Sequence, residues 1–205
     1  MSETTTLNNF EESYDSPLTP ESWGKLGMWL FLAGDAMSFG TLLVGYAFYR
    51  VASLNWPVPS EILGIGLTAF MTFLLIVSSL TMVKGLSAIK QGNVAGLKKY
   101  LTLTILGGVI FLSLQAFEWT HLIGEGLTFS ANPWGSSLFG TTFFTITGFH
   151  GMHVTGGVIY LSVVLRNSAK GKYSPEDYNG VELVGLYWHF VDLVWILVFT
   201  FVYLL

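Results

Sequence analysis

Seven ionisable side chains lie inside long apolar stretches of this 205-residue chain, and they are the residues that could do chemistry. They are Asp35, Glu118, His121, His150, His153, His189 and Asp192. If the stretches cross a bilayer, a charge near its centre costs about 3 kcal/mol on insertion scales, so each group needs a partner, water or a neutral state. Metal ligation, proton transfer and hydrogen bonding between helices are the chemistries open to them.

The spacing of these residues predicts shared helix faces, because positions three, four or seven apart stack on one side of a helix. The predicted stripes are Gln115, Glu118 and His121 on one helix, and Glu182, His189 and Asp192 on another. A third face carries small residues beside His150 and His153, namely Gly148, Gly151 and Thr155, where a neighbouring backbone could approach closely. The simplest interpretation of the polar residues is hydrogen bonding that holds a bundle together.

Three alternatives give these residues a sharper role. Glu118-x-x-His121 has the spacing of a di-iron site, but such a site needs a second Glu-x-x-His and two further Glu residues. His153 and His189 could ligate a haem between two helices. Asp35 and Asp192 could form an ion pathway, although the chain shows no internal repeat of the kind common in transporters.

The elements that must position these residues are transmembrane helices. A crossing helix needs about 20 mostly apolar residues. Five segments meet this length, at residues 26–49, 62–83, 101–123, 138–165 and 183–205. The sequence therefore predicts an all-α polytopic membrane protein, with a polar acidic tail over residues 1–22 and a five-helix transmembrane domain over residues 23–205.

Composition excludes other classes of protein. Hydrophobic residues make up 52% of the chain and charged residues 11%, against about 25% charged in soluble domains. The absence of cysteine excludes a disulfide scaffold and a thiolate metal site. The nine Lys and Arg form no basic stripe, which argues against nucleic-acid binding.

The distribution of cations predicts the orientation. With five crossings, eight of the nine Lys and Arg fall on the side of the N-terminal tail, and Arg50 alone falls on the other. Because positive charge favours the cytoplasmic side, we expect a cytoplasmic N-terminus and an external C-terminus. Counted from the predicted interfaces, Asp35, His150 and Asp192 then lie near mid-depth.

Four short sequence segments along the chain form a recognisable set. They are Trp29-Leu-Phe-Leu-Ala-Gly-Asp35, Gln115-Ala-Phe-Glu118-Trp119, Gly148-Phe-His150-Gly-Met-His153-Val-Thr-Gly-Gly157, and Glu182 followed by Tyr187-Trp-His189-Phe-Val-Asp192-Leu-Val-Trp195. In this order they resemble subunit III of the haem-copper respiratory oxidases, from about Trp23 to Leu205. Many family members have seven helices, so this chain resembles the short bacterial form. The family usually has Glu where this sequence has Asp35, a side chain one methylene shorter.

The resemblance implies an accessory subunit of a bacterial terminal oxidase of the cytochrome c oxidase type, in the inner membrane. Haems and copper would belong to the partner subunits, and this chain would hold no cofactor and no catalytic centre. Its implied partners are subunit I, subunit II, a small subunit IV and phospholipids.

The resemblance also implies roles in stabilising subunit I, supporting proton uptake and holding lipids in a cleft. The cleft would lie between the first two helices and the last three. Two alternatives stay open: subunit III of a quinol oxidase, or a self-contained haem- or ion-binding membrane enzyme or transporter.

Overall fold

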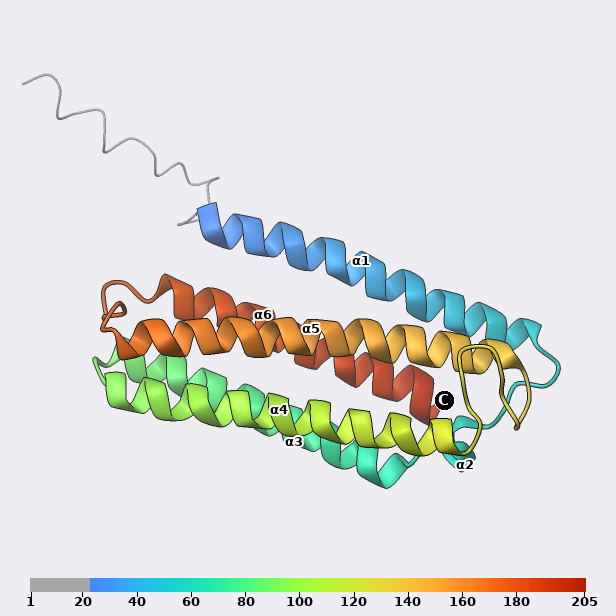
Figure 1. The fold of residues 1–205 in the computed structure, drawn as a ribbon. Helices are drawn as coiled ribbons and strands as arrows, with labels where there is room; N and C mark the ends of the chain where they lie inside the picture. Colours follow the sequence, from blue (N-terminus) through green and yellow to red (C-terminus); the bar gives the residue numbers. More distant parts are fainter. Residues whose placement is uncertain (1–22) are drawn as a thin grey trace, which may run out of the picture.

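The computed structural model describes residues 23–205, so the predicted tail over residues 1–22 lies outside the described residues. The described chain is helical throughout, apart from its connecting loops (Figure 1). Its elements are α1 (Trp23–Ala52), α2 (Pro59–Ile62), α3 (Ile65–Lys90), α4 (Val94–Gly124), α5 (Ser137–Ala169), α6 (Asn179–Val198) and the π-helix η1 (Phe199–Leu204).

Five helices of the described chain are long and apolar enough to cross a membrane: α1, α3, α4, α5, and α6 continued by η1. The predicted five-helix bundle is therefore confirmed. The second span begins at Ile65 rather than at residue 62, because Pro59 starts the separate short helix α2 and Leu63 then adopts an extended conformation. The third span begins at Val94, seven residues before the predicted start, where the Asn93 side chain accepts a hydrogen bond from the Gly96 amide.

Helices α3 to α6 form the main group, and α1 lies on its outside against α5 and α6 (Figure 1). The expectation that the second span joins the first as a separate wall is wrong, because α3 packs against α4 and α6. The physical reason is the connection of residues 91–93, which is too short for α3 and α4 to separate. Where they meet, Gly107 gives room to Ser78, and a Cβ on Gly107 would lie 2.8 Å from the Ser78 Cβ.

Helix α6 is central to the main group, and two tryptophans fix its position. Half of its most apolar stretch is buried, against 11% in α1. The Trp188 indole N–H donates to the Ser78 hydroxyl at 3.0 Å, and the Trp195 indole N–H donates to Thr72 at 3.0 Å. Both hydroxyls lie on α3, so these bonds set the rotation of α6 against its neighbour.

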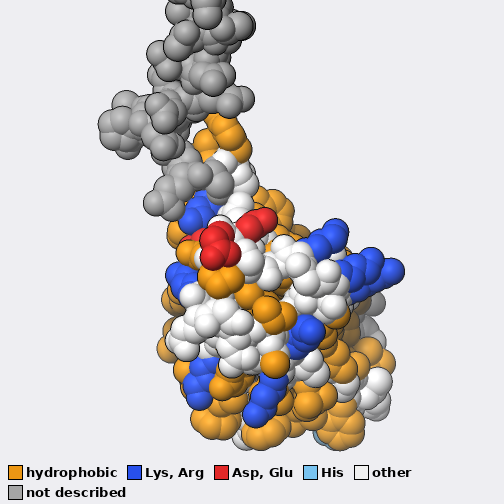
Figure 2. All heavy atoms as spheres, turned by 90° about the vertical axis from the view of Figure 1, so that its left-hand side faces the viewer, with side chains coloured by type: hydrophobic (Ala, Val, Ile, Leu, Met, Phe, Trp, Pro, Cys, Tyr) orange, Lys and Arg blue, Asp and Glu red, His pale blue; other side chains and the backbone are white. Residues whose placement is uncertain are grey.

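The two ends of the bundle differ in charge. The start of α1, the α3–α4 turn and the α5–α6 loop lie at one end of the molecule (Figure 1). Figure 2 shows this end with Lys and Arg side chains spread over it and a few carboxylates gathered toward one edge. The fold thus gathers at one end the loops that the sequence predicts to be cytoplasmic.

The opposite end is closed by a contact between two loops. The Ser136 amide donates to the Asn55 carbonyl oxygen at 2.9 Å. The neighbouring Gly135 has a φ of 154°, and a Cβ there would lie 2.3 Å from the same oxygen. Only glycine fits this approach, which ties the loop after α1 to the loop before α5.

Candidate functional site

The polar side chains predicted to matter are distributed over several contacts between helices. Asp35 meets His153, Glu118 meets two hydroxyls, and His189 lies with Asp192 near a serine. His150 is enclosed by aromatic rings, while Glu182 and His121 form ion pairs nearer the helix ends. The candidate site is therefore a network between helices.

The first contact joins α1 to α5. The Asp35 Oδ2 lies 3.2 Å from the His153 Nε2, and both side chains are mostly buried, with 15% and 13% exposed. The His153 Nδ1 lies 2.8 Å from the Phe149 carbonyl oxygen. Because a carbonyl oxygen only accepts, a proton on Nδ1 completes the bond to Phe149, and Nε2 faces the Asp35 carboxylate.

Two aromatic residues complete this contact. The Tyr187 hydroxyl of α6 donates to the His153 carbonyl oxygen at 2.9 Å. The Phe39 ring of α1 packs edge-on against the His153 ring, with 5.2 Å between the ring centres. Asp35 and His153 are 118 positions apart in sequence, and sequence reasoning did not pair them. Neither residue predicts its partner from the sequence, because their contact depends on how α1 is rotated against α5.

The second contact joins α4 to α3 and to the end of the chain. Glu118 is 3% exposed and accepts two hydrogen bonds, from the Thr68 hydroxyl at 3.0 Å and from the Tyr203 hydroxyl at 2.9 Å. Tyr203 lies in η1, where the wider π-helical turn changes the direction of the last side chains. Sequence reasoning missed both donors, because a threonine and a tyrosine in apolar helices carry no distinguishing signal.

The third contact joins α6 to α3. The Ser79 hydroxyl lies 2.5 Å from the His189 Nδ1. Ser79 also lies against Asp192, which is 6% exposed and whose Oδ1 has no hydrogen-bond partner among residues 23–205. The prediction that His189 and Asp192 share a helix face agrees with this arrangement, and Ser79 is the partner that sequence reasoning missed.

His150 differs from the other histidines because it is fully buried. Its ring lies 4.9 Å from the Trp195 ring and 5.8 Å from the Phe111 ring. Neither of its nitrogens has a hydrogen-bond partner in the described part of the chain. His150 therefore packs as an aromatic residue at the junction of α4, α5 and α6.

Two predicted site residues lie nearer the helix ends. Glu182 is 3.0 Å from the Lys25 Nζ and links α6 to the start of α1. His121 pairs with Glu125 at 3.3 Å, and its side chain is 66% exposed. The predicted stripe with Glu118 is wrong for His121. Each three-residue step rotates the side chain by about −60°, so two such steps from the buried Gln115 turn His121 out of the bundle.

The alternatives with metal centres find no support in this geometry. Glu118 and His121 point to different sides of α4, which separates the two ligands of the proposed di-iron motif. His153 and His189 bond to groups on different helices, Asp35 and Ser79. Among the described residues, no three His, Cys, Asp or Glu side chains form a group that could hold a metal ion.

Comparison with known proteins identifies the family. Residues 23–205 match the family described as cytochrome c oxidase subunit III. The chain is 41% identical to cytochrome c oxidase subunit 3 of Synechocystis sp. over 181 residues, which cover 87% of this chain and 74% of the relative. It is 36% identical to the probable cytochrome c oxidase subunit 3 of Mycobacterium bovis, over 87% of this chain and 86% of the relative. It is 34% identical to cytochrome c oxidase subunit 3 of Thermostichus vulcanus, over 88% of this chain and 86% of the relative.

The matched range contains all five spans and every residue of the network described above. The resemblance inferred from the sequence is thereby confirmed, and this multi-pass chain belongs to the cytochrome c oxidase subunit III family.

Proposed function

We propose that this chain is a non-redox accessory subunit, which stabilises the haem-bearing subunit I, assists proton uptake and holds phospholipid. The observation that carries the proposal is that four of its intramembrane acids and histidines bond to other helices of the same chain, namely Asp35, His153, Glu118 and His189. Such bonds rigidify a bundle and leave the redox chemistry to haems and copper in subunits I and II, with a small subunit IV as a further partner.

Spectroscopy of purified material tests whether the redox cofactors belong to the partner subunits. The chain purified from its complex should carry the haem-bearing partner with it, and the isolated chain should be colourless. A stoichiometric haem or iron signal in the isolated chain would support the alternative of a self-contained haem enzyme. Oxidation of quinol but not of cytochrome c by the intact complex would support the quinol oxidase alternative.

The Asp35–His153 pair supports a role in proton uptake, because it places a carboxyl group and an imidazole, both able to exchange protons, 3.2 Å apart in a mostly buried setting. Asp35→Asn should leave assembly intact, since an amide can still donate to the imidazole. We expect slower proton uptake or faster inactivation during turnover of the complete oxidase. Asp177→Asn, at an exposed loop acid, is the matched control and should change neither rate. Unchanged kinetics and lifetime for Asp35→Asn would assign Asp35 to packing alone.

A groove of about 410 Å³ between α1 and α6 supports phospholipid binding. It is lined mainly by apolar side chains, among them Trp29, Phe190 and Leu193, which suit an acyl chain. Ala36→Trp should fill the groove and lower the phospholipid recovered per complex, as measured by mass spectrometry of lipid extracts. Ala47→Trp, at an exposed position of the same helix outside the groove, should leave the recovery unchanged. Equal recovery from both variants would reject the groove as a lipid site.

We also propose that the N-terminus is cytoplasmic, on the basis of the cations at one end of the bundle. The cysteine-free sequence permits a direct test. Gln91→Cys in the α3–α4 turn should be shielded from a membrane-impermeant maleimide in intact cells. Ser130→Cys in the α4–α5 loop should react. The opposite pattern would reverse the orientation.

A further inference from the structure

The end of the bundle that Figure 2 shows has an excess of positive charge. Seven cations belong to the ends of α3, α4 and α5 and to the loops that follow them there, against two acids of the α5–α6 loop, Glu176 and Asp177. These seven residues form the cationic face: Lys84, Lys90, Lys98, Lys99, Arg166, Lys170 and Lys172. Six of them are exposed, and Lys98 is half-buried. The face thus has five more positive than negative charges.

Contacts between two loops join these cations into one surface. The α3–α4 turn touches the α5–α6 loop, since a Cβ on Gly92 would lie 3.7 Å from the Pro175 side chain. The Lys90 Nζ lies 5.2 Å from the centre of the Tyr178 ring. These contacts hold the two loops side by side, so the cations of α3 and α4 lie on the same surface as those of α5.

The described chain leaves this surface without acidic partners. Within residues 23–205, none of the seven cations forms an ion pair with a carboxylate. The eighth cation at this end, Lys25, lies 3.0 Å from Glu182, and this pair adds nothing to the excess. Because like charges gathered on one surface repel one another, the face is complementary to an anionic partner.

The segment that precedes α1 has the opposite charge. Residues 1–22 lie outside the described structure, and their sequence contains five acids and no Lys or Arg. The acids are Glu3, Glu11, Glu12, Asp15 and Glu21. The segment joins α1 at Trp23, at the same end of the bundle as the cationic face (Figure 1). Its 22 residues can span up to about 70 Å at ~3.3 Å per residue, whereas one helix is ~10–12 Å wide, so every cation of the face lies within its reach.

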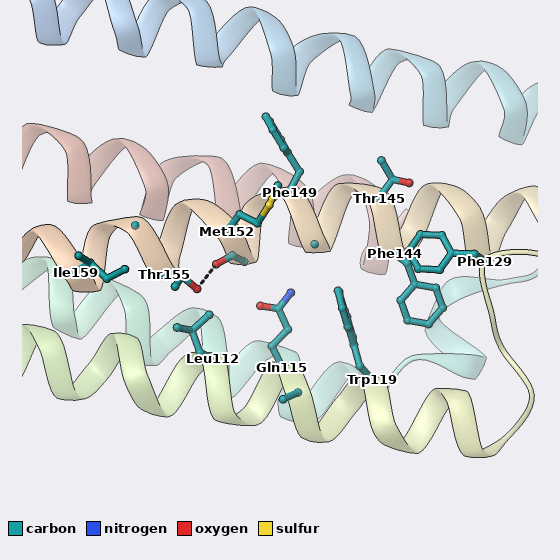
Figure 3. Close-up of a pocket in the computed structure, with 14 residues that line it drawn as sticks. Leu112, Gln115, Trp119, Phe129, Phe144, Thr145, Phe149, Met152, Thr155 and Ile159 are labelled. Atoms are coloured by element: carbon teal, nitrogen blue, oxygen red, sulfur yellow. Dashed lines mark hydrogen bonds between the residues drawn. The ribbon is translucent and has the colours of Figure 1, made fainter.

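The grooves along the bundle do not suit an acidic segment. A groove of about 840 Å³ between α4 and α5 is lined by side chains such as Leu112, Phe144 and Ile159, and by no charged residue (Figure 3). The groove between α1 and α6 likewise has no Lys or Arg in its lining. A carboxylate in either groove would lose its water without gaining a cation. The cationic face is therefore the surface that matches the segment.

We propose that the acidic segment of residues 1–22 docks on the cationic face of its own chain, with its carboxylates against the Lys and Arg side chains. A single exposed ion pair is weak. The covalent link to α1 keeps the acids at an effective concentration of the order of millimolar, which gives them an advantage over free anions. The inference goes beyond the proposed function and does not rest on it, because both partners belong to this chain.

Zero-length crosslinking of the intact complex tests the docking. A water-soluble carbodiimide joins a carboxylate to a lysine amine that it touches, with no spacer between them. By mass spectrometry of the digested chain, we expect peptides that join residues 1–22 to lysines of the cationic face. Their yield should fall at least fivefold in about 0.5 M salt, which screens exposed charges. The absence of such peptides, or crosslinks to Lys25 alone, would overturn the proposal.

The electrostatic effect of the segment gives a separate measurement. Gln91→Cys places one exposed thiol in the α3–α4 turn of this cysteine-free chain. Its rate of reaction with an anionic methanethiosulfonate, divided by the rate with a cationic one, reports the local charge. Glu11→Gln with Glu12→Gln should raise this ratio at least fivefold. Glu61→Gln with Glu125→Gln removes the same charge from exposed positions at the opposite end and should leave the ratio unchanged.

Anionic lipid headgroups are the competing occupants of such a surface. The ratio is therefore measured for the complex in nanodiscs of phosphatidylcholine alone and in nanodiscs that also contain phosphatidylglycerol. A rise caused by the Glu11 and Glu12 substitutions in both lipids would support docking of the segment. A ratio that follows the phosphatidylglycerol content but not these substitutions would assign the face to lipid and overturn the proposal.

Discussion

The Asp35 Oδ2 and the His153 Nε2 lie 3.2 Å apart and form a charged or proton-sharing link between α1 and α5. Helix α1 has few other polar contacts with the main group, of which the Lys25–Glu182 pair and the bond from Tyr46 to the Val202 carbonyl oxygen are two. The link between Asp35 and His153 thus lies where the outermost helix meets the rest of the bundle.

A double-mutant cycle should detect this link. We expect Asp35→Leu and His153→Leu each to destabilise the bundle, and the double variant to lose less than the sum of the two. The coupling should be about 0.6 kcal/mol, the average for polar contacts between membrane helices, and no more than about 1.7 kcal/mol. Denaturant titration of the purified complex measures this coupling, with release of the subunit as the signal. Strictly additive losses would show that the two side chains act independently.

The bond from Tyr203 to Glu118 should hold the end of the chain in place. Tyr203→Phe removes the donor of a 2.9 Å bond while keeping the buried ring, and we expect a loss of about 1 kcal/mol. Hydrogen exchange should rise over Phe199–Leu204 before it rises elsewhere in α6. Tyr49→Phe, on a partly exposed ring of α1, is the control. Unchanged exchange in Tyr203→Phe would mean that packing alone holds η1.

Close packing around Trp188 should make one glycine far less tolerant than another. A Cβ on Gly157 would lie 2.9 Å from the Trp188 ring, so Gly157→Ala should cost about 1–3 kcal/mol by overpacking. A Cβ on Gly34 of α1 would meet nothing within 4 Å. Gly34→Ala should therefore be neutral or stabilising by up to about 1 kcal/mol. Thermal release of the subunit from the complex compares the two, and equal release temperatures would refute the distinction.

Ser79 should contribute more to the stability of the bundle than its neutral side chain suggests. Ser79→Ala removes the group 2.5 Å from the His189 Nδ1 and leaves a half-buried imidazole without its partner on α3. We expect a loss of about 1–3 kcal/mol, the cost of an unsatisfied buried polar group. The same change at Ser113, whose hydroxyl bonds only its own helix, should cost less than 0.5 kcal/mol. Equal effects would show that His189 finds another partner.

The sequence by itself determined the five spans and the set of polar residues inside them. Length and hydropathy suffice for the spans, because a bilayer has a fixed thickness and tolerates only satisfied backbone. The polar residues stand out because they are rare in such segments, as Asp35 and Glu118 are. The sequence segments around His150 and His189 were also sufficient to identify the family.

Only the tertiary structure decided which of these residues meet. Asp35 reaches His153 across 118 positions, Glu118 is held by Thr68 and Tyr203, and His121 turns away from all of them. Helix periodicity relates residues to one another within a helix, but it does not fix how a helix is rotated against its neighbours. In a soluble protein an apolar stripe would supply that rotation. In a bilayer the outer faces are as apolar as the core, so the rotation is set by tryptophan–hydroxyl bonds and glycine contacts between helices.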